Sequence, residues 1–114
     1  MNIVVTGGLG FIGSAFVRYA SSQGAHCTVI DNMTYAADKS RLNGYNYDLV
    51  LKDICDDVAW ACKEAHYIVN FAAESHVDKS IHNGLPFVKS NVEGTFNMIE
   101  IAKQIHNLKK FVQI

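Results

Sequence analysis

Three glycines near the start of the chain have a spacing that suits the binding of a phosphate group. Gly7, Gly10 and Gly13 follow the β-branched run 3–5, and helical periodicity begins at Ile12. In such a turn Gly7 would allow a tight exit from the strand, Gly10 the approach of a pyrophosphate, and Gly13 close packing of the helix on the sheet. Free N–H groups at the positive end of the helix would hold the anion. Glycines also make ordinary turns, but the strand before and the helix after favour a dinucleotide-binding loop.

Two further positions place carboxylates where an adenosine would lie. Asp31 ends the second predicted strand and can accept hydrogen bonds from ribose hydroxyls. Its charge would repel the 2′-phosphate of NADP, and no Arg or Lys follows immediately, so NAD is favoured. The alternative is that Asp31 only caps the loop 32–34. Asp53 and Ile54, at the end of the third predicted strand, could contact the adenine, although a solvated carboxylate and a core isoleucine explain them nearly as well.

The elements that would position these groups alternate along the chain. The predicted strands are short apolar runs at residues 3–5, 27–30, 49–51, 67–71 and 111–114. One helix is expected from Ile12 to a stop at Gly24, a second over 58–65 and a third after Pro86. The third helix should bury an apolar stripe made of Val88, Val92, Phe96, Ile99, Ala102 and Ile105. This pattern predicts an α/β fold with a doubly wound parallel sheet, in which ligands bind beyond the carboxyl ends of the strands.

A length of 114 residues suits one domain, and we expect a single NAD-binding Rossmann-type domain over 1–114. The fifth predicted strand ends the chain with no helix to cover it. The sheet would therefore be incomplete, with an open apolar edge. We expect a fragment that lacks its C-terminal catalytic and substrate-binding region, or a short chain that hides this edge in a homo-oligomer.

The composition excludes several classes of protein. A formal charge of −1 argues against nucleic acid and membrane surfaces as partners, because both need a basic excess. No apolar run approaches the roughly 20 residues of a membrane helix, and the start of the chain lacks the basic region of a signal peptide. Three cysteines without close pairs fit neither a disulfide framework nor a zinc ribbon, and the five histidines form no metal-ligand motif. We expect a cytoplasmic protein with reduced thiols and no metal.

The most informative stretch follows the fourth predicted strand and reads FAAESHVDKSI over residues 71–81. Two small residues there allow close approach of a cofactor, and the polar residues that follow are too many for an ordinary crossover. Together with GGLGFIGS, DNMTYA, KDICD and SNVEGT, this stretch resembles the extended short-chain dehydrogenase/reductase superfamily. More closely, the chain is similar to the N-terminal part of the dTDP-glucose 4,6-dehydratase family, over essentially its whole length.

The resemblance implies a role for each matching residue. Phe11 and Ile12 would lie over the pyrophosphate of NAD. The adenosine would be held by Asp31, Asn32, Met33, Thr34, Asp53 and Ile54. The nicotinamide side would be lined by Phe71, Ala72, Ala73, Glu74 and Ser75. Ser75 would also face the sugar substrate, and Ser90 stands where the family usually has a Thr that contacts the cofactor.

The resemblance also implies a reaction of deoxysugar biosynthesis. NAD takes a hydride from C4 of a nucleotide-linked glucose, water leaves across C5–C6, and the hydride returns to C6. The family uses an Asp-Glu pair and a Tyr-Lys pair for this lyase chemistry, and both would lie beyond Ile114. The match from Tyr35 to Lys39 lies beside the expected adenosine pocket and is interpreted as a coincidence.

The chain by itself is therefore expected to be inactive, and a nucleotide sugar would be a partner only if the missing C-terminal part were supplied. Three alternatives remain open. The chain could be a binding module for NAD or another adenine nucleotide, part of a related nucleotide-sugar epimerase or decarboxylase, or a structural remnant that binds nothing.

Overall fold

The computed structural model describes residues 1–33, 37–72 and 89–114 of the chain, without the side chains of residues 89 and 90. Five strands form one parallel sheet in the order β3-β2-β1-β4-β5. The strands are β1 (Asn2–Thr6), β2 (His26–Asp31), β3 (Asp48–Leu51), β4 (Tyr67–Asn70) and β5 (Lys110–Gln113). The doubly wound α/β fold predicted from the sequence is confirmed, and each strand end lies within one residue of its predicted position. Among the described residues the sheet ends at β5, which pairs with β4.

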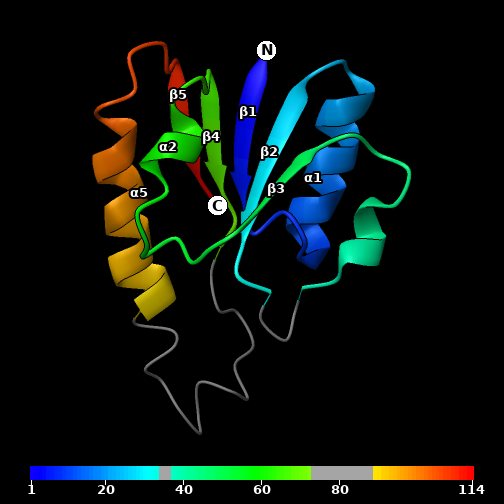
Figure 1. Cartoon of the computed structure of the whole chain (residues 1–114), viewed down its shortest axis with the longest axis horizontal. Coiled ribbons are helices and arrows are strands. Elements are labelled where there is room, and N and C mark those ends of the chain that lie inside the picture. Colours follow the sequence, from blue (N-terminus) through cyan, green and yellow to red (C-terminus); the bar gives the residue numbers. More distant parts are fainter. Residues whose placement is uncertain (34–36, 73–88) are drawn as a thin grey trace, which may run out of the picture.

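Helices cover both faces of the sheet (Figure 1). They are α1 (Phe11–Ser22), the 3-10 turn η1 (Lys39–Leu42), α2 (Ala59–Cys62), the π-helical η2 (Lys89–Gly94) and α5 (Thr95–Ala102). Alternate strand residues divide between two cores, because successive side chains of a strand point to opposite faces. Ile3 and Val5 pack with Val17 of α1, whereas Val4 packs with Cys62 of α2 and Met98 of α5. Both faces of β1 are therefore buried, which explains its unbroken apolar sequence.

The helix α1 forms where the sequence predicts it and ends before Gly24, whose φ of +89° is typical of a glycine that follows a helix. Its inward face is made of small residues rather than of the larger apolar ones. Gly13, Ser14, Val17 and Ala20 are buried, whereas Ile12 and Tyr19 are exposed. Small side chains allow the helix to lie close to β1 and β2.

The stripe predicted for the helix after Pro86 is wrong in its central part. Val92 is 61% exposed and Phe96 65% exposed, and Ile99 is exposed as well. The inward positions of α5 are Met98 and Ile101 instead. The physical reason is the π-helical segment η2. Because of its i→i+5 hydrogen bonds, the residues that face the sheet differ from those expected for a uniform helix of 3.6 residues per turn.

The two ends of that stripe have different outcomes. Ala102 and Ile105 are partly buried and do pack against the second core, which is the one that contains Val4 and Met98. Pro86 and Val88 lie outside the described residues. Within the described parts of the chain, no helix is long and apolar enough to cross a bilayer, and no group of three or more side chains could ligate a metal.

Candidate functional site

The glycine loop, residues 7–13 at the junction of β1 and α1, passes between the carboxyl ends of β2 and β4. Gly7 has a φ of +70°, and its amide donates to the carbonyl of Ile30 at 2.8 Å. A Cβ at Gly7 would lie 2.8 Å from the backbone nitrogen of Ala72. The conformation and the contact both require glycine, so the loop makes the tight exit that the sequence predicts.

The same loop turns directly into α1. The amide of Gly10 donates to the carbonyl of Gly7 at 3.1 Å, and a Cβ at Gly13 would lie only 2.2 Å from that carbonyl oxygen. Gly10 is the N-cap of α1, and no side chain among the described residues caps the helix. The first amides of α1 therefore remain available to an anion, and the exposed side chains of Phe11 and Ile12 flank them.

Gly8 also belongs to this loop, although no separate role for it was predicted from the sequence. A Cβ at Gly8 would lie 2.7 Å from a methyl carbon of Val29 on β2. The Gly-Gly doublet directly after a strand is the signal that could have identified it.

Asp31 joins the end of β2 to the glycine loop. Its side chain accepts hydrogen bonds from the amide of Leu9 at 3.1 Å and from the amide of Met33 at 2.8 Å, one on each carboxylate oxygen. The residue is only 8% exposed. The bond from Met33 is the loop cap that the sequence offers as the alternative role of Asp31. A carboxylate has about four acceptor sites, so capacity for ribose hydroxyls remains beside the cap.

The loop after β3 lies next to the loop after β2. Asn32 donates its side-chain amide to Asp53 at 3.2 Å, and Asp53 accepts from the amide of Cys55 at 2.8 Å. Met33 has a φ of +57° and is partly exposed beside them. With Asp31, which accepts from the amide of Met33, the structure thus brings together four of the residues predicted to hold the adenosine. Thr34 lies outside the described residues.

Ile54 occupies a different position from its neighbour Asp53. Its side chain is 4% exposed and packs in the second core, which corresponds to the core alternative considered from the sequence. Asn97 of α5 holds this loop in place. Its side-chain amide donates to the carbonyls of Ile54 at 2.6 Å and Asp56 at 2.8 Å. Sequence reasoning missed Asn97, because these contacts join segments more than 40 residues apart.

Phe71 and Ala72 follow β4 and contact the glycine loop. Ala72 donates its amide to Thr6 at 3.2 Å, and the ring of Phe71 packs against that of Phe16 in α1, with 5.6 Å between the centroids. Ala73, Glu74 and Ser75 lie outside the described residues, and for Ser90 the structure gives only its place in η2.

A basic residue holds the glycine loop from its outer side. Arg41 of η1 donates from Nη1 to the carbonyl of Leu9 at 2.8 Å, and the amide of Asp38 donates to the same oxygen at 3.0 Å. Arg18 of α1 in turn donates to the carbonyl of Arg41 at 3.1 Å. Hydrogen bonds from Ser40 lower the pKa of Asp38, which caps η1. None of these residues was predicted from the sequence to have a role.

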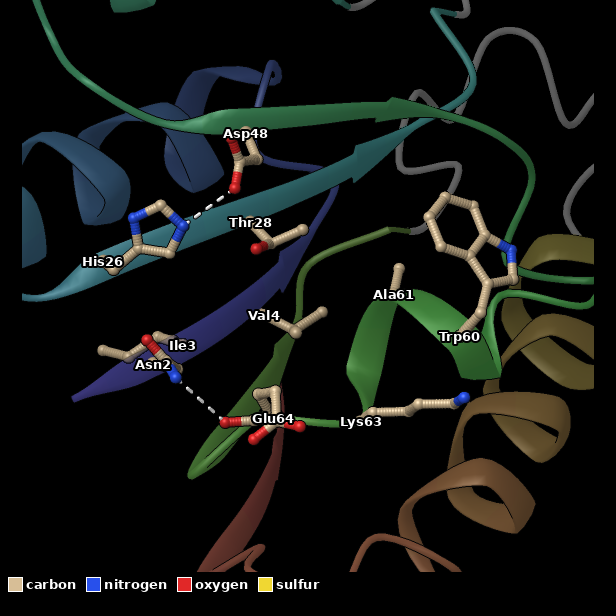
Figure 2. Close-up of a pocket in the computed structure, with 11 residues that line it drawn as sticks. Asn2, Ile3, Val4, His26, Thr28, Asp48, Trp60, Ala61, Lys63 and Glu64 are labelled. Carbon is tan, nitrogen blue, oxygen red and sulfur yellow. Dashed lines mark hydrogen bonds and ion pairs between the residues drawn. The ribbon is translucent and has the colours of Figure 1, made fainter.

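A pocket of about 300 Å³ lies elsewhere, at the amino ends of the strands (Figure 2). Its wall includes the first residues of β1, β2 and β3, which are Asn2, His26 and Asp48, together with exposed Trp60 of α2. The glycine loop, Asp31 and Ala72 all lie at the opposite, carboxyl ends. This pocket is therefore separate from the candidate site.

A parallel sheet with a glycine loop at the start of its first helix, and a carboxylate at the end of its second strand, defines a Rossmann-type nucleotide-binding domain. Comparison with known proteins gives the family. Residues 3–114 match the model of the NAD dependent epimerase/dehydratase family, and the chain belongs to that family.

Curated relatives share substantial sequence with the chain. It is 46% identical over 112 residues to a probable dTDP-glucose 4,6-dehydratase of Sinorhizobium fredii, covering 91% of this chain and 32% of the relative. It is 44% identical over 121 residues to the low-salt glycan biosynthesis protein Agl12 of Haloferax volcanii, covering 100% of this chain and 39% of the relative. The chain thus spans about a third of the length of these relatives.

Solved structures of nucleotide-sugar enzymes superpose well on this fold. The UDP-glucose 4-epimerase of Thermotoga maritima has a TM-score of 0.90 at 29% identity, covering 99% of this chain and 37% of the epimerase. DesIV, a dTDP-glucose 4,6-dehydratase of Streptomyces venezuelae with NAD bound, has a TM-score of 0.85 at 37% identity, covering 90% of this chain and 35% of DesIV.

Proposed function

We propose that this chain is the NAD-binding part of a nucleotide-sugar dehydratase related to dTDP-glucose 4,6-dehydratase. The observation that carries the proposal is the arrangement of two groups beyond the carboxyl ends of the strands. There the uncapped first turn of α1 and the carboxylate of Asp31 lie on either side of Leu9. The first turn of α1 suits a pyrophosphate and the carboxylate of Asp31 suits a ribose, and a dinucleotide contains both.

The described residues fit that cofactor in three parts. The amides that begin α1 hold the pyrophosphate, under the side chains of Phe11 and Ile12. The free acceptor sites of Asp31 take the ribose hydroxyls, and Asp53 takes the adenine amine. Bound NAD supplies the hydride acceptor for oxidation of a sugar.

The nicotinamide half of the site depends on the segment after β4. Phe71 and Ala72 begin it at the contact with Gly7, and Ala73, Glu74, Ser75 and Ser90 complete it in this proposal. Ser75 also faces the sugar. The 114 residues contain no Asp-Glu pair after β5 and no Tyr-Lys pair at the nicotinamide, so the chain alone binds NAD without dehydrating a sugar.

Three wider statements belong to the same proposal. The 114 residues form a single Rossmann-type domain, which acts in the cytoplasm. A nucleotide sugar binds when the C-terminal part of a full-length relative is supplied. Where no C-terminal part continues the sheet, two copies associate through the open edge of β5 instead.

An epimerase is the second candidate, because the Thermotoga maritima UDP-glucose 4-epimerase has the high TM-score of 0.90. The dehydratase is preferred on sequence. The identities to curated dehydratases, such as 46% and 41%, exceed the 29% to that epimerase.

Calorimetric titration of the chain with NAD and NADP tests the proposal. We expect NAD to bind and NADP to bind at least about tenfold more weakly, because the carboxylate of Asp31 repels a 2′-phosphate. The absence of heat at millimolar NAD would refute it. Incubation with dTDP-glucose and NAD should give no 4-keto-6-deoxy product, and measurable conversion would refute the claim that the chain alone is inactive.

A further inference from the structure

Three polar side chains form a row across the carboxyl ends of neighbouring strands in the sheet. Thr6 of β1 is the register partner of Asn70 on β4, and Asn70 is the register partner of Gln113 on β5. Thr6 and Asn70 are completely buried, whereas Gln113 is exposed. A completely buried polar pair is costly unless every polar group in it has a hydrogen-bond partner.

The hydrogen bonds of this row have a fixed direction. The amide of Ala72 donates to the hydroxyl oxygen of Thr6 at 3.2 Å, and that hydroxyl donates to Oδ1 of Asn70. The side-chain nitrogen of Asn70 must then point to the other side. There it donates to Oε1 of Gln113 at 2.8 Å and to the hydroxyl of Thr95 on α5 at 3.5 Å. Each bond fixes the orientation of the next, so the row acts as one unit.

The row ends where two segments of the proposed cofactor site lie close together. Gly7 lies so near the backbone of Phe71 and Ala72 that a Cβ there would be within 3 Å of both. A shift of Ala72 would therefore move either the exit of β4 or the glycine loop. The bond from Ala72 to Thr6 holds the two segments together at this point.

We infer that Thr6 and Asn70 are positioning residues for the cofactor, and that they couple the site to Gln113 at the end of β5. The inference rests on the proposed function, since it assumes that NAD binds between the glycine loop and the segment after β4. It adds that cofactor affinity depends on the last strand of the sheet, through side chains that do not themselves touch the cofactor.

Matched substitutions at Thr6 test the inference. Thr6→Val keeps the shape but removes the hydroxyl, whereas Thr6→Ser keeps the hydroxyl and removes a methyl group. NAD affinity is measured by calorimetry at a temperature at which circular dichroism shows each variant folded. We expect Thr6→Val to weaken binding about tenfold and Thr6→Ser to stay within about twofold of the unsubstituted chain. A purely structural role would change the melting temperatures but leave the affinity of the folded molecules unchanged, and that result would overturn the inference.

A second pair of variants covers the case in which Thr6→Val does not fold. Gln113→Leu removes the acceptor of Asn70 at an exposed position, and Gln104→Leu makes the same change at an exposed glutamine outside the row. We expect Gln113→Leu, but not Gln104→Leu, to weaken NAD binding and to speed hydrogen exchange of the Ala72 amide, observed by NMR. Equal behaviour of the two variants would overturn the inference.

Hydrogen exchange also separates this inference from the proposed function. If the unsubstituted chain binds no NAD, the proposed function fails. Exchange at Ala72 then decides the coupling by itself, and unchanged exchange in Gln113→Leu would show that the row does not act as a unit.

Discussion

The carboxylate of Asp31 accepts a hydrogen bond from the backbone amide of Leu9 at 3.1 Å, which ties the end of β2 to the middle of the glycine loop. On the other side of Leu9, its carbonyl oxygen accepts from Arg41 at 2.8 Å. The loop that would hold a pyrophosphate is therefore fixed from both sides before any ligand binds. Such preorganisation lowers the ordering cost of binding.

Replacement of Asp31 by alanine tests its place in the site. We expect Asp31→Ala to weaken NAD binding by about 1–3 kcal/mol, because a buried acceptor for the ribose is lost. Asp48→Ala is the matched control, since Asp48 is an exposed carboxylate at the amino end of β3, where it pairs with His26. Calorimetry of both variants measures the effect. An unchanged affinity in Asp31→Ala would remove this residue from the site.

The two later glycines of the loop should differ in their effect on stability. A Cβ at Gly13 would lie 2.2 Å from the carbonyl oxygen of Gly7, whereas a Cβ at Gly10 would lie 3.3 Å from it. We therefore expect Gly13→Ala to lower the free energy of unfolding by about 3 kcal/mol or more, and Gly10→Ala by about 1 kcal/mol. Urea denaturation monitored by circular dichroism measures both. Equal losses would contradict the close packing of α1 on the loop.

Asn97 should stabilise the loop after β3. Asn97→Asp is nearly isosteric but replaces a nitrogen that donates to two carbonyls by an oxygen that would repel them. We expect the free energy of unfolding to fall by about 2 kcal/mol. Asn46→Asp introduces the same charge at an exposed position and should have little effect. If the two variants are equally stable in urea, the Asn97 contacts contribute nothing.

The buried thiol of Cys62 predicts a pH dependence of stability. Burial raises the pKa of Cys62 to about 11, from an ordinary value of 9.0. Between these values the unfolded chain loses the proton that the folded chain keeps, so stability is complete below pH 9 and falls as the pH rises toward 11. We expect the unsubstituted chain to lose about 1–3 kcal/mol more over this range than Cys62→Ala. Parallel curves of unfolding free energy against pH for the two proteins would contradict this.

Strands that are buried on both faces of the sheet were the easiest elements to predict from the sequence. Val4 and Val5 pack in opposite cores, and such residues leave an unbroken apolar run. The glycine loop was also predictable, because the conformation of Gly7 and the contact at Gly13 each demand glycine. A local constraint of this kind leaves a local signal in the sequence.

The remaining features depend on relationships that the sequence does not display. The exposed face of α5 was predicted to be buried, since the phase change in η2 cannot be read from apolar spacing. The row from Thr6 through Asn70 to Gln113 appears only when the register of three strands is known. Asn97 likewise acts on a loop that only the tertiary structure brings near it.

NAD bound as proposed lies across the carboxyl ends of the strands, with its pyrophosphate at the start of α1. NMR spectra of the chain titrated with NAD report this position residue by residue. We predict that the amide signals of Phe11, Ile12 and Gly13 shift strongly, while the indole signal of Trp60 in the pocket at the amino ends stays in place. Shifts centred on Trp60, or no shifts at the start of α1 at saturating NAD, would show that NAD does not bind at the glycine loop.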